Sequence, residues 1–237
     1  MFRFSSDAPI FERLNFNRTY TEGRKKRMKL LTLRLAQGDK TVTKAVRQDG
    51  HTLTEIEGFS DVGALLRSEG WEATAQNASG ATHPIEGADL DAVVPAPGKI
   101  ICVGHNYRNH IKEMGREVPE FPTLFAKYAE SLIGPNDDLA LPQESSTVDW
   151  ESELAVVIGK KGRRISEADA ADHIAGYAVL NDVSMRDYQF RTIQWLQGKT
   201  WEKSTPFGPA LVTKDEFNGG LMTTAVDGEI QQQTPTN

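Results

Sequence analysis

VDWESELAVVIG, residues 148–159, combines β-branched, aromatic and aliphatic residues and closes on a glycine. This composition is typical of a strand in the interior of a protein. Residues two apart in a strand share a face, so Glu151 and Glu153 are predicted to point the same way. The fold is therefore expected to be organised around a buried strand that carries two neighbouring carboxylates.

These two carboxylates need an explanation, because like charges repel and a carboxylate resists removal from water. A divalent cation would offset both effects, and Mg²⁺ in particular prefers oxygen ligands. The alternative is an edge strand whose polar face is solvated. The stretch by itself leaves both interpretations open.

The whole chain has the composition of a soluble globular protein, with 38% hydrophobic and 25% charged residues among 237. It has no run near the roughly 18 apolar residues that a transmembrane helix needs. The formal net charge of −6 disfavours nucleic acid and anionic membranes as partners. Cys102 is the single cysteine and lies in an apolar run, which predicts a buried hydrophobe and no disulfide. We expect a cytoplasmic protein.

Residues 1–27 differ from the rest, because they carry a net charge of +4 while the remaining 210 residues carry −10. No long apolar stretch follows the first charges, so a secretory signal is excluded. An organellar presequence is an alternative, opposed by Asp7, Glu12 and Glu22. We hypothesise instead that translation starts at Met28, after a segment that a ribosome-binding-like stretch can encode. A native N-terminal peptide beginning before Met28 would contradict this.

From Met28 the pattern predicts a small β domain with a linker, residues 28–97. Residues 29–35 and 41–46 alternate, and Asp49-Gly50 predicts a turn before a third strand. Ser60 is the expected cap of a short helix, and residues 72–97 are expected to form a loop or linker. This region contains no cluster of titratable groups that would form a site.

Residues 98–237 are predicted to form the catalytic domain, and their first helix is expected at residues 106–115. His110 and Glu113 are three apart on this helix and share a face. A carboxylate beside an imidazole raises its basicity and orients it, as a general base for water requires. A solvated surface pair is the alternative.

Two further candidates come from the second half of this region. Asp182 follows the strand predicted at residues 177–180, where a carboxylate is either a metal ligand or a turn residue. Lys199 follows a glycine between aromatic residues, where it either faces an anionic ligand or is an ordinary surface lysine. The residue pattern leaves these alternatives open.

Together and in this order, the motifs resemble the fumarylacetoacetate hydrolase family, especially its bacterial acylpyruvate hydrolase, isomerase and decarboxylase branches. The resemblance covers residues 98–237 firmly and the region from Met28 loosely. The matching motifs are Gly104-His105-Asn106-Tyr107 with His110 and Glu113, Asp149-Trp150-Glu151-Ser152-Glu153-Leu154, Gly176-Tyr177, Asn181-Asp182-Val183-Ser184, Arg186-Asp187, Gly198-Lys199-Thr200 and Pro206-Phe207-Gly208-Pro209.

The resemblance implies an α+β, mainly β fold, a mixed β-roll with a small N-terminal β domain, and a homodimer. It implies that Glu151, Glu153 and Asp182 bind Mg²⁺ or Mn²⁺. It also implies that His110 and Glu113 form the dyad that activates water. A small 2-oxo acid substrate would complete the metal coordination.

By the same resemblance Lys199 stabilises developing negative charge, and Gln189 and Arg186 bind substrate. The expected reaction is hydrolysis of the C–C bond of a 3-acylpyruvate, such as a fumarylpyruvate-like acid, in aromatic or 2-oxo acid catabolism. The alternatives at the same metal site are an oxaloacetate decarboxylase or tautomerase and a dienedioate isomerase. A non-catalytic binding module or inactive fragment is a third possibility.

The chain departs from the family in two places. A further carboxylate that precedes the catalytic histidine in fumarylacetoacetases is Val103 here, which weakens the case for fumarylacetoacetate itself. The family also continues past Asn237, so the catalytic domain is expected to be truncated at its C-terminus. We therefore expect exposed sheet edges and low solubility or activity at this length.

Overall fold

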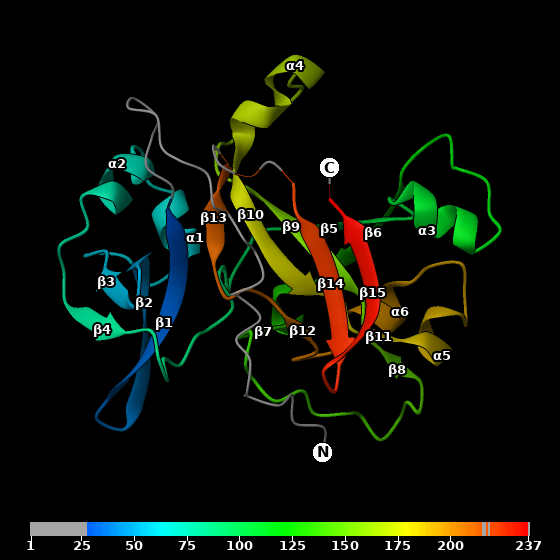
Figure 1. The fold of residues 1–237 in the computed structure, drawn as a ribbon, viewed down its shortest axis with the longest axis horizontal. Helices are drawn as coiled ribbons and strands as arrows, with labels where there is room; N and C mark the ends of the chain where they lie inside the picture. Colours follow the sequence, from blue (N-terminus) through cyan, green and yellow to red (C-terminus); the bar gives the residue numbers. More distant parts are fainter. Residues whose placement is uncertain (1–27, 215–216, 218, 237) are drawn as a thin grey trace.

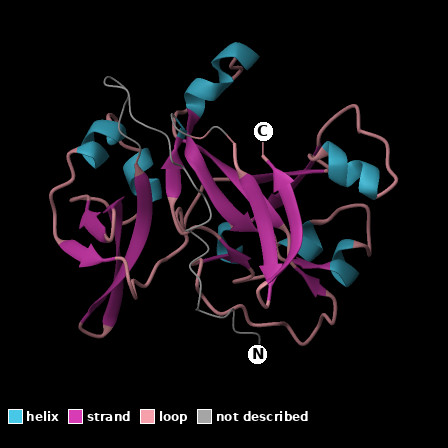
Figure 2. Cartoon of the chain, in the orientation of Figure 1, coloured by secondary structure: helices cyan, strands magenta, loops and turns pink. Residues whose placement is uncertain are grey.

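The computed structural model describes residues 28–214, 217 and 219–236, so predictions about residues 1–27 lie outside the described residues. Strands predominate and the helices are short (Figure 2), as the expected mainly β fold class requires. The largest unit is an antiparallel seven-stranded sheet (Figure 1). Its strand order is β4 (Thr82–Pro84), β3 (Thr52–Glu55), β2 (Lys40–Asp49), β1 (Lys29–Gln37), β13 (Leu211–Thr213), β10 (Ile174–Asn181) and β9 (Ser152–Ile158).

The first three strands form the hairpins that the alternating pattern predicts. Gly38 and Gly50 adopt φ angles of 61° and 60° at the two turns, which glycine tolerates because it has no Cβ. Alternation along β1 places Leu31 and Leu33 on one face, where they are 1% and 2% exposed. Both belong to an apolar cluster with Val46 of β2.

The same sheet joins this N-terminal region to the rest of the protein. Leu30 of β1 pairs with Leu211 of β13, and both side chains are completely buried. They share one apolar cluster with Val62 and Phe207. Residues 28–97 therefore contribute to a sheet and a core that continue beyond them, and the division into two domains stays a prediction.

A group of ion pairs centred on Arg34 fixes a loop to the sheet. The Arg34 guanidinium contacts both oxygens of Asp137 at 2.7 Å and also reaches Asp91 at 2.8 Å and Asp89 at 3.2 Å. The hydrogen bonds from Arg34 lower the pKa of the Asp137 carboxyl. Asp137 also accepts a hydrogen bond from the backbone N–H of Gly134, which closes the loop.

Two local predictions in this region differ from the structure. Helix α1 (Val62–Leu66) is capped by Asp61, whose carboxylate accepts a hydrogen bond from the Ala64 N–H, whereas the Ser60 hydroxyl bonds to Asp61. Helix α2 (Trp71–Gln76) and strand β4 form largely within residues 72–97, where a loop was expected. Arg47 of β2 stabilises the end of α2 by donating to the last carbonyls, a long-range contact that local sequence does not reveal.

Smaller sheets and short helices make up the remainder of the described residues. Two of the smaller pairings are β5 with β6 and β14 with β15, both antiparallel, and none of the described helices could span a membrane. These remaining elements are β5 (Ile100–Gly104), α3 (Arg108–Glu113), β6 (Thr123–Lys127), η2 (Ala129–Ser131), β7 (Leu132–Ile133), β8 (Val148–Asp149), α4 (Glu167–Ala170), η3 (Ala171–His173), β11 (Ser184–Met185), α5 (Arg186–Gln189), α6 (Leu196–Lys199), β12 (Thr205–Pro206), β14 (Leu221–Val226) and β15 (Glu229–Pro235).

Candidate active site

The stretch 148–159 forms two strands where one buried strand was expected. β8 pairs with β11, whereas β9 pairs with β10 in the large sheet, so the chain changes partners at Trp150 and Glu151. The carboxylate of Asp149 accepts a hydrogen bond from the Trp150 N–H at this break. β9 is the outermost strand of its sheet, and Val156 and Ile158 are 48% and 62% exposed. β9 thus has the edge position of the alternative, but its exposed residues are apolar, and Ala155 and Val157, which share a face with Glu153, pack against the core.

Pairing of β9 with β10 nevertheless brings the three predicted metal ligands to one end of these strands. The Asp182 N–H donates to the Glu151 carbonyl at 2.8 Å, and Glu153 pairs in register with Leu180. The side-chain oxygen of Asn181 accepts from the Glu151 N–H at 3.1 Å. We call Glu151, Glu153 and Asp182 the carboxylate cluster.

Two buried lysines face this cluster. The Lys199 ammonium is 2.7 Å from Glu151 Oε2 and 2.9 Å from Asp182 Oδ2. The Lys127 ammonium is 2.8 Å from Asp182 Oδ1 and also donates to the Lys199 carbonyl. The two lysine side chains are 1% and 0% exposed, and that of Asp182 is 3% exposed. The burial of Lys199 excludes the surface-lysine alternative, and its role toward an anionic ligand stays a prediction. Lys127 was not predicted.

Arg186 links the carboxylate cluster to Asp149 of β8 and to Gln189 of α5. Its guanidinium contacts Glu151 Oε1 at 2.5 Å and Asp149 Oδ2 at 2.8 Å. It also donates to the side-chain oxygen of Gln189 at 2.8 Å, and Gln189 is 5% exposed. Burial alone would lower the pKa of Arg186, but the neighbouring carboxylates Glu151 and Asp149 raise it. The two predicted substrate-binding residues, Arg186 and Gln189, therefore do lie beside the predicted metal ligands.

The electrostatics of the cluster leave Glu153 with the least compensated charge. Burial, followed by repulsion from Glu151 and Asp182, raises the pKa of Glu153 to about 7. Burial and the Asp182 charge raise the pKa of Cys102 to about 12, so its thiol stays protonated. Burial lowers the pKa of Lys127, and its contact with Asp182 opposes this shift.

The predicted water-activating dyad lies on α3. His110 Nδ1 is 3.5 Å from Glu113 Oε2, and their side chains are 53% and 78% exposed. In the described part of the chain no hydrogen bond or ion pair links either residue to the carboxylate cluster, and α3 stands apart from β9 and β10 (Figure 1). The structure thus brings the dyad residues together but does not place them in the cluster.

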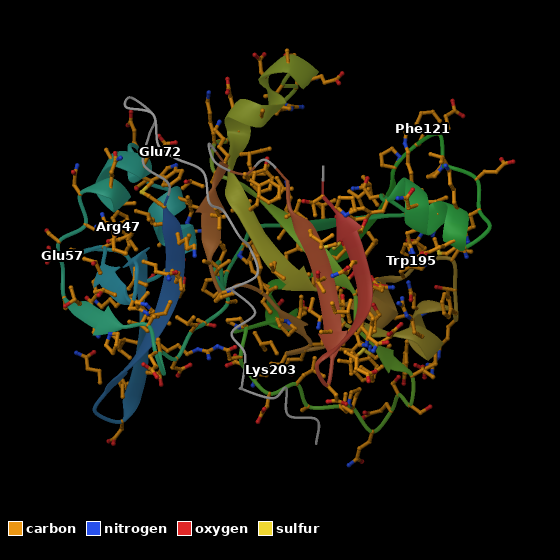
Figure 3. All side chains as sticks on the ribbon, viewed as in Figure 1. Arg47, Glu57, Glu72, Phe121, Trp195 and Lys203 are labelled. Carbon is orange, nitrogen blue, oxygen red and sulfur yellow. The ribbon has the colours of Figure 1, made fainter. Side chains whose placement is uncertain are left out.

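An aromatic side chain outside the predicted set lies between these two parts. Trp195, labelled in Figure 3, packs edge-on against Phe125 of β6 at a centroid distance of 5.4 Å and against His105 at 5.6 Å. Its ring occupies the space that a Cβ on Gly104 would need, 2.6 Å away. The Phe125 ring in turn lies 5.1 Å from the Lys199 ammonium. Trp195 therefore connects the segment before α3 with the lysine end of the site.

The carboxylate cluster suits a divalent cation in donor type and in charge. Its ligands are hard carboxylate oxygens, the kind that Mg²⁺ and Mn²⁺ prefer, and the raised pKa of Glu153 marks a carboxylate that needs a positive neighbour. The oxygens of Glu151 and Asp182 face protein cations in this structure. Accordingly, among the described residues no three His, Cys, Asp or Glu side chains are arranged as a metal-binding group.

Comparison with known proteins identifies the class to which this fold and site belong. The family model described as fumarylacetoacetate (FAA) hydrolase C-terminal matches residues 99–237. A relative in Xenopus laevis, a mitochondrial oxaloacetate tautomerase, is 39% identical over 227 residues, covering 87% of this chain and 71% of the relative. The chain belongs to the fumarylacetoacetate hydrolase family.

Individual proteins and solved structures are also similar to this chain. A human mitochondrial oxaloacetate tautomerase is 49% identical over 151 residues, which are 62% of this chain and 48% of the human protein. The solved 2-hydroxyhepta-2,4-diene-1,7-dioate isomerase from Mycobacterium marinum has a TM-score of 0.68 at 31% identity, over 88% of this chain and 75% of that one. The fumarylacetoacetate hydrolase from Exiguobacterium antarcticum has a TM-score of 0.67 at 29% identity, with coverages of 88% and 75%. These likenesses confirm the predicted family and fold, and the cytoplasmic location stays a prediction.

Proposed function

We propose that the protein catalyses metal-dependent keto–enol tautomerisation of a small 2-oxo dicarboxylic acid of the oxaloacetate type. The observation that carries this proposal is the contact of the buried Lys199 ammonium with both Glu151 and Asp182. This contact places carboxylates that could bind a cation next to a buried ammonium that could stabilise the negative charge formed during enolisation. The tautomerase description of the frog and human relatives supports it.

Tautomerisation requires only that a proton moves from carbon to oxygen. One proton leaves C3 of the keto acid and one is added to the 2-oxo oxygen, so no water is consumed and no C–C bond breaks. Negative charge develops on that oxygen in the transition state, and fixed positive groups in a site shielded from water stabilise it strongly. When bound at the carboxylate cluster, a divalent cation would supply Lewis-acid polarisation of the 2-oxo group.

The residues of this chain then have distinct tasks. Lys199 offers its ammonium to the developing enolate oxygen, because among the described residues this buried ammonium has hydrogen bonds only to Glu151 and Asp182. Gln189 has its oxygen held by Arg186, which turns its NH₂ donors toward other partners such as a substrate carboxylate. Lys127 supplies a second buried positive charge, in contact with Asp182.

A spectroscopic assay tests the proposal directly. Enol oxaloacetate is added to the protein in Mg²⁺ and then in EDTA, and the decay of the enol absorbance is recorded. We expect catalysis that requires the metal and falls about 10²-fold or more in Glu151→Gln, because that variant loses a ligand charge. Glu167→Gln, in the exposed helix α4, is the matched control and should retain activity. Equal rates in Mg²⁺ and EDTA would contradict the proposal.

Hydrolysis of a 3-acylpyruvate is the second candidate function. The proximity of His110 to Glu113 favours it. The exposure of the dyad places hydrolysis second, since a base that activates water must reach the cleaved bond.

His110→Ala separates the two reactions. Tautomerisation should stay within about tenfold of the wild-type rate, whereas any hydrolysis of acetylpyruvate should fall by about 10²-fold or more because its general base is gone. If wild-type protein releases pyruvate from acetylpyruvate and does not tautomerise oxaloacetate, hydrolysis becomes the first candidate function and tautomerisation the second.

A further inference from the structure

Protein cations contact all four carboxylate oxygens of Glu151 and Asp182. Glu151 Oε1 contacts Arg186 and Oε2 contacts Lys199, at 2.5 and 2.7 Å. Asp182 Oδ1 contacts Lys127 and Oδ2 contacts Lys199, at 2.8 and 2.9 Å. A divalent cation that used these oxygens as ligands would compete with the three protein cations for the same two carboxylates.

The three cations differ in how firmly they are held. Lys127 is completely buried and donates to the Lys199 carbonyl as well as contacting Asp182. Arg186 is also held by Asp149 and by Gln189. In the described part of the chain, the Lys199 ammonium has hydrogen bonds to Glu151 and Asp182 and to no other group. Lys199 is therefore the cation that can leave with the fewest other contacts broken.

We propose that the Lys199 ammonium and the divalent cation exchange places on Glu151 and Asp182. Without metal, Lys199 neutralises these two carboxylates. Metal binding releases its ammonium, which then faces the substrate, while Lys127 and Arg186 stay as permanent counter-charges. This inference rests on the metal dependence of the proposed function.

The surroundings of Lys199 suit such an exchange. Two carboxylates without a cation would repel each other and resist burial, so the exchange keeps them neutralised in both states. The Phe125 ring, 5.1 Å from the ammonium, provides a neighbouring aromatic face that attracts a cation. Through the same movement, metal binding would free the Lys199 ammonium to contact the substrate.

Calorimetric titration with Mg²⁺ tests the exchange without measuring activity. Lys199→Met removes the competing ammonium, so we expect its Kd for Mg²⁺ to fall about tenfold relative to wild type. Lys160→Met, which removes an exposed lysine at the end of β9, is the matched control and should bind like wild type. An unchanged or higher Kd in Lys199→Met would overturn the proposal.

The wild-type protein gives a second test that does not depend on the folding of a variant. Amine acetylation by acetic anhydride, followed by mass spectrometry, reports which lysines are accessible. Lys199 should react faster in Mg²⁺ than in EDTA, whereas Lys127 should stay protected in both. Equal or slower labelling of Lys199 in Mg²⁺ would overturn the exchange.

The two proposals fail in distinguishable ways. If wild-type protein binds no Mg²⁺, the metal dependence of the proposed function is wrong and the exchange is wrong with it. If wild-type protein binds Mg²⁺ and Lys199 remains protected, only the exchange is wrong.

Discussion

Lys127→Met tests how much the buried charge network stabilises the metal-free protein. The Lys127 side chain is 0% exposed, and its ammonium lies 2.8 Å from Asp182 Oδ1. Methionine has a similar length and fills the same space without charge. The substitution therefore removes one ion pair and leaves the Asp182 carboxylate, itself 3% exposed, with Lys199 as its remaining cation.

The expected loss follows from the burial of both partners. Removing one partner of a buried ion pair costs about 3–5 kcal/mol, because the other charge stays in a dry environment. Lys199 still neutralises part of the Asp182 charge, so we expect the lower end, about 3 kcal/mol. For a domain of this size that corresponds to a decrease in Tm of about 6–12 °C.

Urea and thermal unfolding followed by circular dichroism in EDTA measure this loss. Lys160→Met is the control for loss of a lysine charge at an exposed position and should stay within about 0.5 kcal/mol of wild type. Lys127→Arg, which keeps the charge, should recover part of the stability. If Lys127→Met unfolds at the same urea concentration as wild type, the ion pair between Lys127 and Asp182 does not stabilise the fold.

Three other predictions concern the rest of the fold. Arg34 lowers the pKa of Asp137 below its usual 3.8, so the stabilisation is complete above about pH 4 and is lost as the pH falls through the folded-state pKa. Asp137→Asn should thus flatten the decrease in Tm between about pH 5 and pH 2, and an unchanged decrease would contradict this. Gly104→Ala should cost about 1–3 kcal/mol of unfolding free energy, because its Cβ would lie 2.6 Å from the Trp195 ring, and a neutral effect would refute that contact. We also propose a homodimer, supported by the exposed apolar side chains of β9 and β10; sedimentation velocity should then give twice the chain mass of 26.2 kDa, and a monomer would exclude it.

Local patterns in the sequence predicted those parts of the fold that depend on neighbours along the chain. The alternation before Gly50 and the Asp49-Gly50 turn are confirmed by β1 to β3. Ser166 caps α4 by accepting a hydrogen bond from the N–H of Asp169, three residues further along the chain. Such features were accessible because a turn or a cap is determined by residues a few positions apart.

The site was predictable only in part, because its contacts join distant segments. Carboxylates in an apolar stretch indicated Glu151 and Glu153, and their closeness to Asp182 follows from strand pairing. Lys127 gave no comparable signal, since a lysine at the end of a strand is usually a surface residue. Its burial depends on Asp182, 55 positions away in the chain, and on the Lys199 carbonyl.

The break between β8 and β9 was also hidden in the sequence. Residues 148–158 have the composition of one continuous strand, and nothing local marks the change of partner from β11 to β10. The exposure of Val156 and Ile158 likewise depends on β9 being outermost in its sheet, which is a property of the topology.

The measurement that most directly tests the central claim is a titration with Mn²⁺ followed by electron paramagnetic resonance, which reports the free ion. We expect about one tight Mn²⁺ site per chain in wild-type protein, displaced by Mg²⁺, because the three carboxylates of the cluster lie at the same end of β9 and β10. Glu153→Gln and Asp182→Asn should each weaken this site, whereas Glu167→Gln should not. Tight Mn²⁺ binding that persists unchanged in both cluster variants would contradict the assignment of these residues as the metal site.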